Sequence, residues 1–185
     1  MAYRNGTYVA FHAGGTSDPT ASDIRYYRTL KMWEANSNIE FKMNDSHEKT
    51  YAVRDTSTRE TLASRLKERL KNSCNFLLLV SPRTKNDTDW VPFEIEYGID
   101  ACHLPIVAAY VDYDKIMTPS ELRSLWPAAL RSRIDSNIAR VIHIPFKKNF
   151  VDHAIRNYTV NKLPDGALTH YTLDFHNRLS KISWI

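Results

Sequence analysis

A nearly continuous apolar run in the middle of the chain, Asn75-Phe76-Leu77-Leu78-Leu79-Val80, constrains the fold more than any other feature. The run has the length of a strand but lacks the polar/apolar alternation of a strand with one solvated face. It therefore predicts a central strand of a parallel sheet that is covered on both sides by helices. A chain of 185 residues, 43% of them apolar, can supply that core within one domain.

Short apolar runs alternate with longer amphipathic segments along the rest of the chain. The other runs of strand length lie at residues 7–12, 39–43, 104–111 and 141–144. The amphipathic segments predict helices around residues 24–33, 57–71 and 168–182, one that begins at Trp90, and two short ones on either side of Trp126-Pro127. This alternation predicts an α/β fold, a flavodoxin-like, doubly wound and mainly parallel sheet of five strands. We expect a main domain over residues 1–145 and a helical C-terminal extension over 146–185 that packs on it.

Three helix starts carry specific signals. Ser57 and Glu60 form a capping box, in which each side chain satisfies a backbone amide of the first turn. Asp89 is placed to cap the helix that begins at Trp90. Thr118 to Glu121 combine another capping box with proline at the first helical position.

Charge, cysteine content and known motifs exclude several classes of function. The net charge of +4 is spread along the chain, whereas a nucleic-acid-binding protein concentrates its basic residues on one face. No apolar stretch approaches the ~20 residues of a membrane-spanning helix, and the first residues lack the apolar run of a signal peptide, so we expect a cytoplasmic protein. Cys74 and Cys102 are interpreted as buried, unpaired thiols. No nucleotide-binding glycine motif, metal-binding histidine pair or serine-nucleophile motif occurs, so we expect neither a metal nor a cofactor.

The loops at the carboxyl ends of the strands are the places to look for a site, because ligands of open α/β sheets bind there. Residues 44–50 are unusually rich in hydrogen-bonding side chains, although an ordinary surface loop has a similar composition. Trp90 and Glu94 share one helix face, and Tyr97 is expected to extend it. A carboxylate framed by aromatic rings is a candidate catalytic group; the alternative is a solvated glutamate beside a core tryptophan.

These segments resemble the TIR domain family, particularly the bacterial TIR-like proteins of Thoeris antiphage systems. Residues 8–12 are similar to the opening strand of the family, and residues 45–55 stand at its BB loop. Leu77-Leu78-Leu79-Val80-Ser81 followed by Trp90-Val91-Pro92-Phe93-Glu94-Ile95 resembles its W-x-x-x-E-I segment. The opening strand carries Phe11-His12 where the family commonly has F-I-S-Y.

The resemblance implies an enzyme that cleaves NAD⁺ at the N-glycosyl bond, with Glu94 as its catalytic residue. Candidate substrate-binding residues follow from their positions in the matching segments: Phe11, His12, Asp45, Ser46, His47 and Trp90. It further implies a cyclic ADP-ribose isomer made as an immune signal for a separate effector protein, with self-assembly on activation. Two alternatives remain open: a non-catalytic TIR interaction module that docks partners through its loops and the basic helix around residues 58–72, and a nucleoside N-glycosidase or deoxyribosyltransferase.

Overall fold

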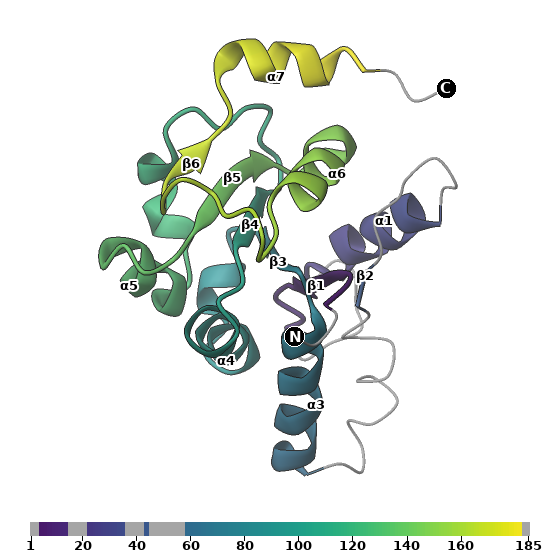
Figure 1. Ribbon diagram of the computed structural model, residues 1–185, viewed down its shortest axis with the longest axis vertical. Coiled ribbons are helices and arrows are strands. Elements are labelled where there is room, and N and C mark those ends of the chain that lie inside the picture. The colour runs from purple at the N-terminus through teal and green to yellow at the C-terminus, as the bar shows by residue number, and fades with distance from the viewer. Residues whose placement is uncertain (1–3, 15–21, 36–42, 45–57, 183–185) are drawn as a thin grey trace.

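The computed structural model describes residues 4–14, 22–35, 43–44 and 58–182, and its centre is an all-parallel sheet of six strands (Figure 1). The spatial order of the strands is β2-β1-β3-β4-β5-β6. Their bounds are β1 Thr7–Ala10, β2 Met43–Asn44, β3 Asn75–Val80, β4 Ile106–Tyr110, β5 Val141–Pro145 and β6 Thr169–His170. The first five have the order of a flavodoxin-like sheet, which confirms the predicted fold class.

Strand β3 has the bounds that its apolar run predicts, and all six of its residues are buried. Its side chains alternate between two separate core clusters. Phe76, Leu78 and Val80 belong to one cluster, and Leu77 and Leu79 belong to the other. The strand is therefore covered on both faces, which explains why it lacks a polar alternation.

Among the described residues, three helices cover each face of the sheet. The bounds are α1 Ile24–Glu34, α3 Arg59–Asn72, α4 Trp90–Glu96, α5 Ala128–Asp135, α6 Lys148–Asn157 and α7 Leu173–Ser180. Buried residues of α3, α4 and α5 fill the first cluster, whereas those of α1, α6 and α7 fill the second. Figure 1 shows α3 and α4 close together, away from α6 and α7. Short 3₁₀ helices lie at Thr84–Asn86 and Pro119–Leu125, and a π-helix lies at Tyr97–Ala101.

Prolines and capping residues in the sequence predicted some helix boundaries better than others. The break at Trp126-Pro127 is confirmed, because one short helix ends at Leu125 and α5 begins at Ala128. The predicted cap of α3 is off by one residue: Thr58, rather than Ser57, is its N-cap and accepts a hydrogen bond from the amide of Thr61. Both are short hydroxyl side chains, so residue type alone did not separate them.

The described part of the extension packs on the same sheet. Helix α6, which periodicity did not reveal, places Phe150 and Val151 in the second core cluster. Strand β6 pairs with β5 at the edge of the sheet and occupies residues that the sequence assigned to the closing helix, so α7 begins only at Leu173. The boundary at residue 145 stays a prediction.

The structure also locates the two cysteines. Cys102 is buried as expected, whereas Cys74 is only partly buried, and both are unpaired. Loss of hydration raises the pKa of both thiols, so they are poor nucleophiles at neutral pH. Among the described helices, none combines the length and apolar character that crossing a bilayer requires.

Candidate functional site

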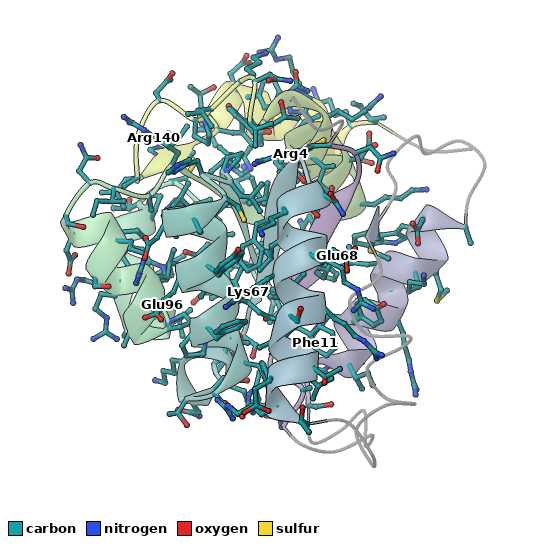
Figure 2. All side chains as sticks on the ribbon, turned by 60° about the horizontal axis from the view of Figure 1, so that its bottom comes forward. Arg4, Phe11, Lys67, Glu68, Glu96 and Arg140 are labelled. Carbon is teal, nitrogen blue, oxygen red and sulfur yellow. The ribbon has the colours of Figure 1, made fainter. Side chains whose placement is uncertain are left out.

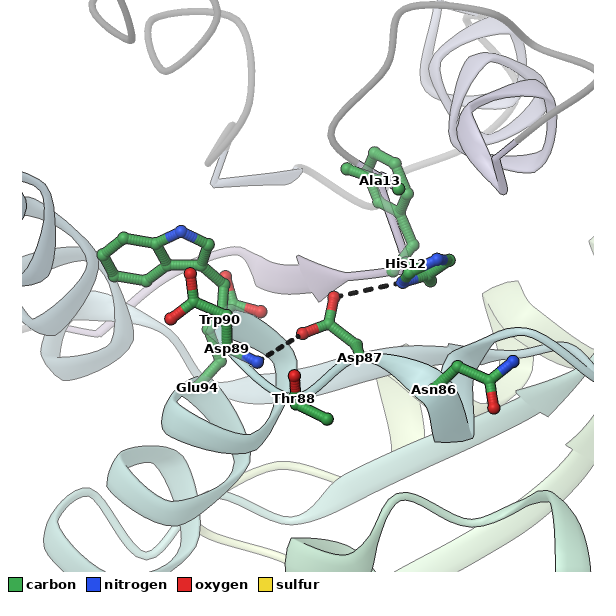
Figure 3. A pocket seen from close by; sticks show the side chains of 10 residues that line it. His12, Ala13, Asn86, Asp87, Thr88, Asp89, Trp90 and Glu94 are labelled. Atoms are coloured by element: carbon green, nitrogen blue, oxygen red, sulfur yellow. Dashed lines mark hydrogen bonds and ion pairs between the residues drawn. The ribbon is translucent and has the colours of Figure 1, made fainter.

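A cavity of about 470 Å³ opens at the carboxyl end of β1, between that strand and the start of α4 (Figure 3). Its walls come from the segment that follows β1, the loop that precedes α4, and α4 itself. The lining residues are Phe11, His12, Ala13, Gly14, Asn86, Asp87, Thr88, Asp89, Trp90 and Glu94. The cavity thus lies where ligands of parallel α/β sheets bind, and four of the seven predicted site residues line it.

Glu94 reaches this cavity from inside the protein. The residue is only 3% exposed, and its Oε1 accepts a hydrogen bond of 2.6 Å from the hydroxyl of Tyr8 on β1. Tyr8 is fully buried, and its ring stacks on Phe76 with the centroids 5.3 Å apart. The interpretation of Glu94 as a solvated helix residue is therefore wrong.

The start of α4, which carries Trp90 and Glu94, is capped by Asp87. Asp87 Oδ1 accepts hydrogen bonds from the backbone amides of Asp89 (3.0 Å) and Val91 (3.3 Å). Asp89 occupies the N-cap position, but its side chain makes no capping bond. The prediction that Asp89 caps this helix is wrong in that respect, because a carboxylate two residues earlier reaches the same orphan amides.

His12 is bound to the other oxygen of the same carboxylate. Its Nδ1 lies 3.2 Å from Asp87 Oδ2, as the dashed line in Figure 3 shows. A carboxylate only accepts, so Nδ1 carries the proton in this bond. Asp87 therefore connects the end of β1 with the start of α4, which fixes the opposite walls of the cavity.

The buried residue Asp23 links the segment after β1, which lines the cavity, to the segment after β3. Its Oδ2 accepts a hydrogen bond of 2.7 Å from the hydroxyl of Ser81, and its amide donates to the carbonyl of His12. Burial raises the pKa of Asp23, while the Ser81 hydroxyl and the nearby charges of His12 and Arg83 oppose that shift. Asp23 is not among the residues that line the cavity, so its contribution is to hold the loops together.

Trp90 forms the rim of the cavity on the side of α3. The guanidinium of Arg59 lies 5.0 Å from its ring centroid and forms an ion pair with Asp89. Phe93 meets the Trp90 ring edge-on at 5.8 Å and stacks on Tyr97. Tyr97 does not line the cavity, in contrast to our expectation that it extends the face of Glu94.

The aromatic row formed by Trp90, Phe93 and Tyr97 lies against α3. The ammonium group of Lys67 is 5.3 Å from the Tyr97 ring centroid, and Figure 2 shows Lys67 between α3 and α4 with Glu68 on the opposite side of α3. The row thus anchors α4 to a basic helix, while Glu94 faces the sheet.

The remaining predicted site residues differ in how much the structure says of them. Phe11 lines the cavity, but its ring is 2% exposed and stacks on Tyr27 with the centroids 5.0 Å apart. Little of Phe11 is therefore accessible to a substrate. Asp45, Ser46 and His47 lie outside the described residues.

The lining of the cavity is acidic. Asp87, Asp89 and Glu94 all contribute carboxylates; Arg59 at the rim pairs with Asp89, and His12 binds Asp87. Such a lining favours a ligand that presents positive charge to it. Within the described ranges, no group of three or more potential metal ligands is placed to hold an ion.

The family model of the Thoeris protein ThsB, TIR-like domain, matches residues 8–116. The chain belongs to this family. The matched segment begins at Tyr8 and includes every residue that lines the cavity of the TIR-like domain, as well as Asp45, Ser46 and His47. Membership supports a TIR-domain role in antiphage defence.

Proposed function

We propose that this TIR-like domain cleaves NAD⁺ and releases nicotinamide, with Glu94 as the catalytic carboxylate. The single observation that carries the proposal is a buried glutamate at the cavity wall, in the family segment where NAD⁺-cleaving TIR domains have their catalytic residue. Asp87 fixes the helix that carries Glu94, and Tyr8 fixes its carboxylate. Both supports limit the motion of the group, as a catalytic carboxylate requires.

The chemistry needs one well-placed negative charge. The bond between the nicotinamide nitrogen and ribose C1′ breaks, and its electron pair leaves with the nitrogen, so nicotinamide departs as a neutral molecule. No general acid is required at that step, in contrast to ordinary glycosidases that protonate a poor leaving group. Positive charge develops on the ribose, and the Glu94 carboxylate stabilises it through hydrogen bonds to the sugar hydroxyls and through its field.

The acidic lining fits the reacting end of this substrate. The nicotinamide ring of NAD⁺ is positively charged, whereas the diphosphate is negative. We therefore place the nicotinamide riboside in the cavity, with Trp90 at its rim, and the diphosphate outside the reach of the three carboxylates. Loss of the ring's charge on cleavage weakens its binding, which favours release of the product.

The acceptor determines the second product. Water gives ADP-ribose and a proton, so that NAD⁺ and water balance nicotinamide, ADP-ribose and H⁺. A ribose hydroxyl or an adenine nitrogen of the same molecule gives a cyclic ADP-ribose isomer instead. We favour cyclisation, because the family serves antiphage defence and a diffusible product can act as a signal for a separate effector protein.

Glu94→Gln tests the reaction, because it keeps the shape of the side chain and removes its charge. We expect nicotinamide release to fall about 100- to 1000-fold, the size of effect found when a preorganised electrostatic group is removed. Glu96→Gln is the matched control, since Glu96 lies two residues further along the same helix and is exposed. Products from NAD⁺ and from free nucleosides are separated and identified by mass spectrometry, in purified protein and in extracts of phage-infected cells.

Three outcomes separate the alternatives. Nicotinamide release that survives Glu94→Gln refutes the assignment of the catalytic residue. Cleavage of nucleosides but not of NAD⁺ supports a nucleoside glycosidase. Intact NAD⁺ in both assays, together with phage protection that survives Glu94→Gln, supports an interaction module.

A further inference from the structure

We propose that Tyr8 is a positioning residue for the reaction, and that its hydroxyl holds the Glu94 carboxylate in the orientation that meets the ribose. This inference rests on the proposed function and assigns a role to a residue outside the sequence motif. Tyr8 lies 86 positions before Glu94 on a different element, and the two meet only because β1 and α4 pack together.

The contact has the geometry of a strong hydrogen bond. The distance from the Tyr8 hydroxyl to Glu94 Oε1 is 2.6 Å, within the 2.5–2.7 Å range of bonds between a hydroxyl and an ionised carboxylate. Tyr8 is fully buried and Glu94 is 3% exposed, so water competes little for either partner. A bond of this kind restrains a side chain that otherwise has several accessible rotamers.

The donor itself cannot move far. The Tyr8 ring stacks on Phe76, and the same two residues are register partners in the pairing of β1 with β3. The hydroxyl is thus fixed by the most buried part of the sheet, and the carboxylate takes its orientation from there. A group that is aligned before the substrate binds needs no reorganisation in the transition state, which is where it lowers the barrier.

The hydroxyl also favours the charged form of Glu94. A hydrogen-bond donor aimed at a carboxylate stabilises the anion relative to the acid, whereas burial alone disfavours the anion. The proposed reaction needs the anion to face the developing positive charge. A phenylalanine at position 8 would fill the same space against Phe76 without providing this donor.

Tyr8→Phe removes one oxygen and tests the role directly. We expect kcat for nicotinamide release to fall about 10- to 100-fold while KM for NAD⁺ stays within about twofold, because the bond aligns the carboxylate without contacting the substrate. Tyr110→Phe is the matched control: Tyr110 is also fully buried on a strand, and its hydroxyl is also hydrogen-bonded, but its partners His143 and Trp126 do not line the cavity. It should lower the melting temperature and leave the kcat of the folded protein unchanged.

A double variant distinguishes positioning from a general loss of stability. Adding Tyr8→Phe to Glu94→Gln should cause no further loss of residual activity if Tyr8 acts only through the carboxylate. Independent, multiplicative losses overturn the inference, as does a Tyr8→Phe protein with wild-type kcat. If Tyr8→Phe does not fold, 3-fluorotyrosine at position 8 keeps the ring and alters the strength of the donor; an unchanged kcat then overturns the inference.

The same experiment separates failure of this inference from failure of the proposed function. A wild-type protein that never releases nicotinamide refutes the function, and the inference with it. A wild-type protein that turns over, loses activity with Glu94→Gln and keeps it with Tyr8→Phe refutes the inference alone.

Discussion

Two buried tyrosines, Tyr8 on β1 and Tyr110 on β4, belong to the same core cluster but differ in where their hydroxyl bonds lead. The Tyr110 hydroxyl donates to Nδ1 of His143 at 2.7 Å and accepts from Nε1 of Trp126 at 2.6 Å. The other ring nitrogen of His143 donates to the carbonyl of Ala167 at 2.9 Å. Each polar side-chain atom in this group therefore has a partner within the protein.

The Tyr8 hydroxyl, by contrast, donates to a carboxylate that lines the cavity. The difference teaches how to interpret buried polar groups in this fold. The Tyr110 network is closed, so it contributes to the uniqueness of the core and offers nothing to a ligand. The Tyr8 bond ends on a charged group beside a cavity, and such a group is a candidate for chemistry.

We expect the largest loss of stability from Tyr110→Phe, which removes the hydroxyl that bonds both His143 and Trp126. The substitution leaves the Trp126 donor and the His143 acceptor buried without their partner, and each such group costs about 1–3 kcal/mol. We expect the free energy of unfolding to fall by about 4 kcal/mol, measured by chemical denaturation. The kcat of the proposed NAD⁺ cleavage, measured on the folded protein, should not change.

A Tyr110→Phe protein with normal stability and reduced kcat would contradict the structural role that we assign to Tyr110. The two tyrosines would then have exchanged the roles that we assign to them. A loss of both properties would show that the C-terminal half of the sheet communicates with the cavity.

The fold could be predicted from the sequence far better than the contacts of the site. The apolar run from Asn75 to Val80 predicted both ends of β3 correctly, because its length is that of a strand and all six residues are buried. Periodicity missed α6, and β6 is only two residues long and too short to carry a pattern. The strand-end rule and the family resemblance directed attention to Glu94 and Trp90, and both line the cavity.

The partners of Glu94 and His12 were beyond sequence analysis for a physical reason. Tyr8 looks like one more apolar residue of a buried strand, and only the packing of α4 on β1 brings its hydroxyl to Glu94. Asp87 lies in a polar loop where any of several residues could cap α4, and it is separated from His12 by 75 positions. Contacts between distant segments depend on backbone geometry, whereas periodicity reports only on burial.

The closed network also predicts a dependence of stability on pH. Burial lowers the pKa of His143 from 6.5 to about 4, because the imidazolium form would lose its hydration. The folded protein then binds fewer protons than the unfolded chain between these values. The stabilisation is therefore fully present above pH 6.5 and is lost as the pH falls toward 4, by at most about 3 kcal/mol.

His143→Gln checks this assignment, since glutamine cannot titrate in that range. The variant is less stable at pH 7, but its stability should fall less steeply between pH 6.5 and 4, measured by denaturation at a series of pH values. Burial also lowers the pKa of His153 and of His176, so some slope remains. Equal slopes in the two proteins would place the acid sensitivity outside the closed network.

The smallest expected effect concerns helix α4, which positions Glu94 for its hydrogen bond from Tyr8. Asp87→Ala removes the acceptor of two α4 amides, and losing such a cap costs about 1 kcal/mol of stability. Asp89→Ala removes the residue that the sequence suggested as the cap, and we expect no measurable change, because its exposed carboxylate only pairs with Arg59. Chemical denaturation of both variants measures the difference. A larger loss for Asp89→Ala would mean that the N-cap position, rather than the observed bonds of Asp87, fixes the start of α4. The hydrogen-bonded pair of Tyr8 and Glu94 would then depend on a different support from the one the structure shows.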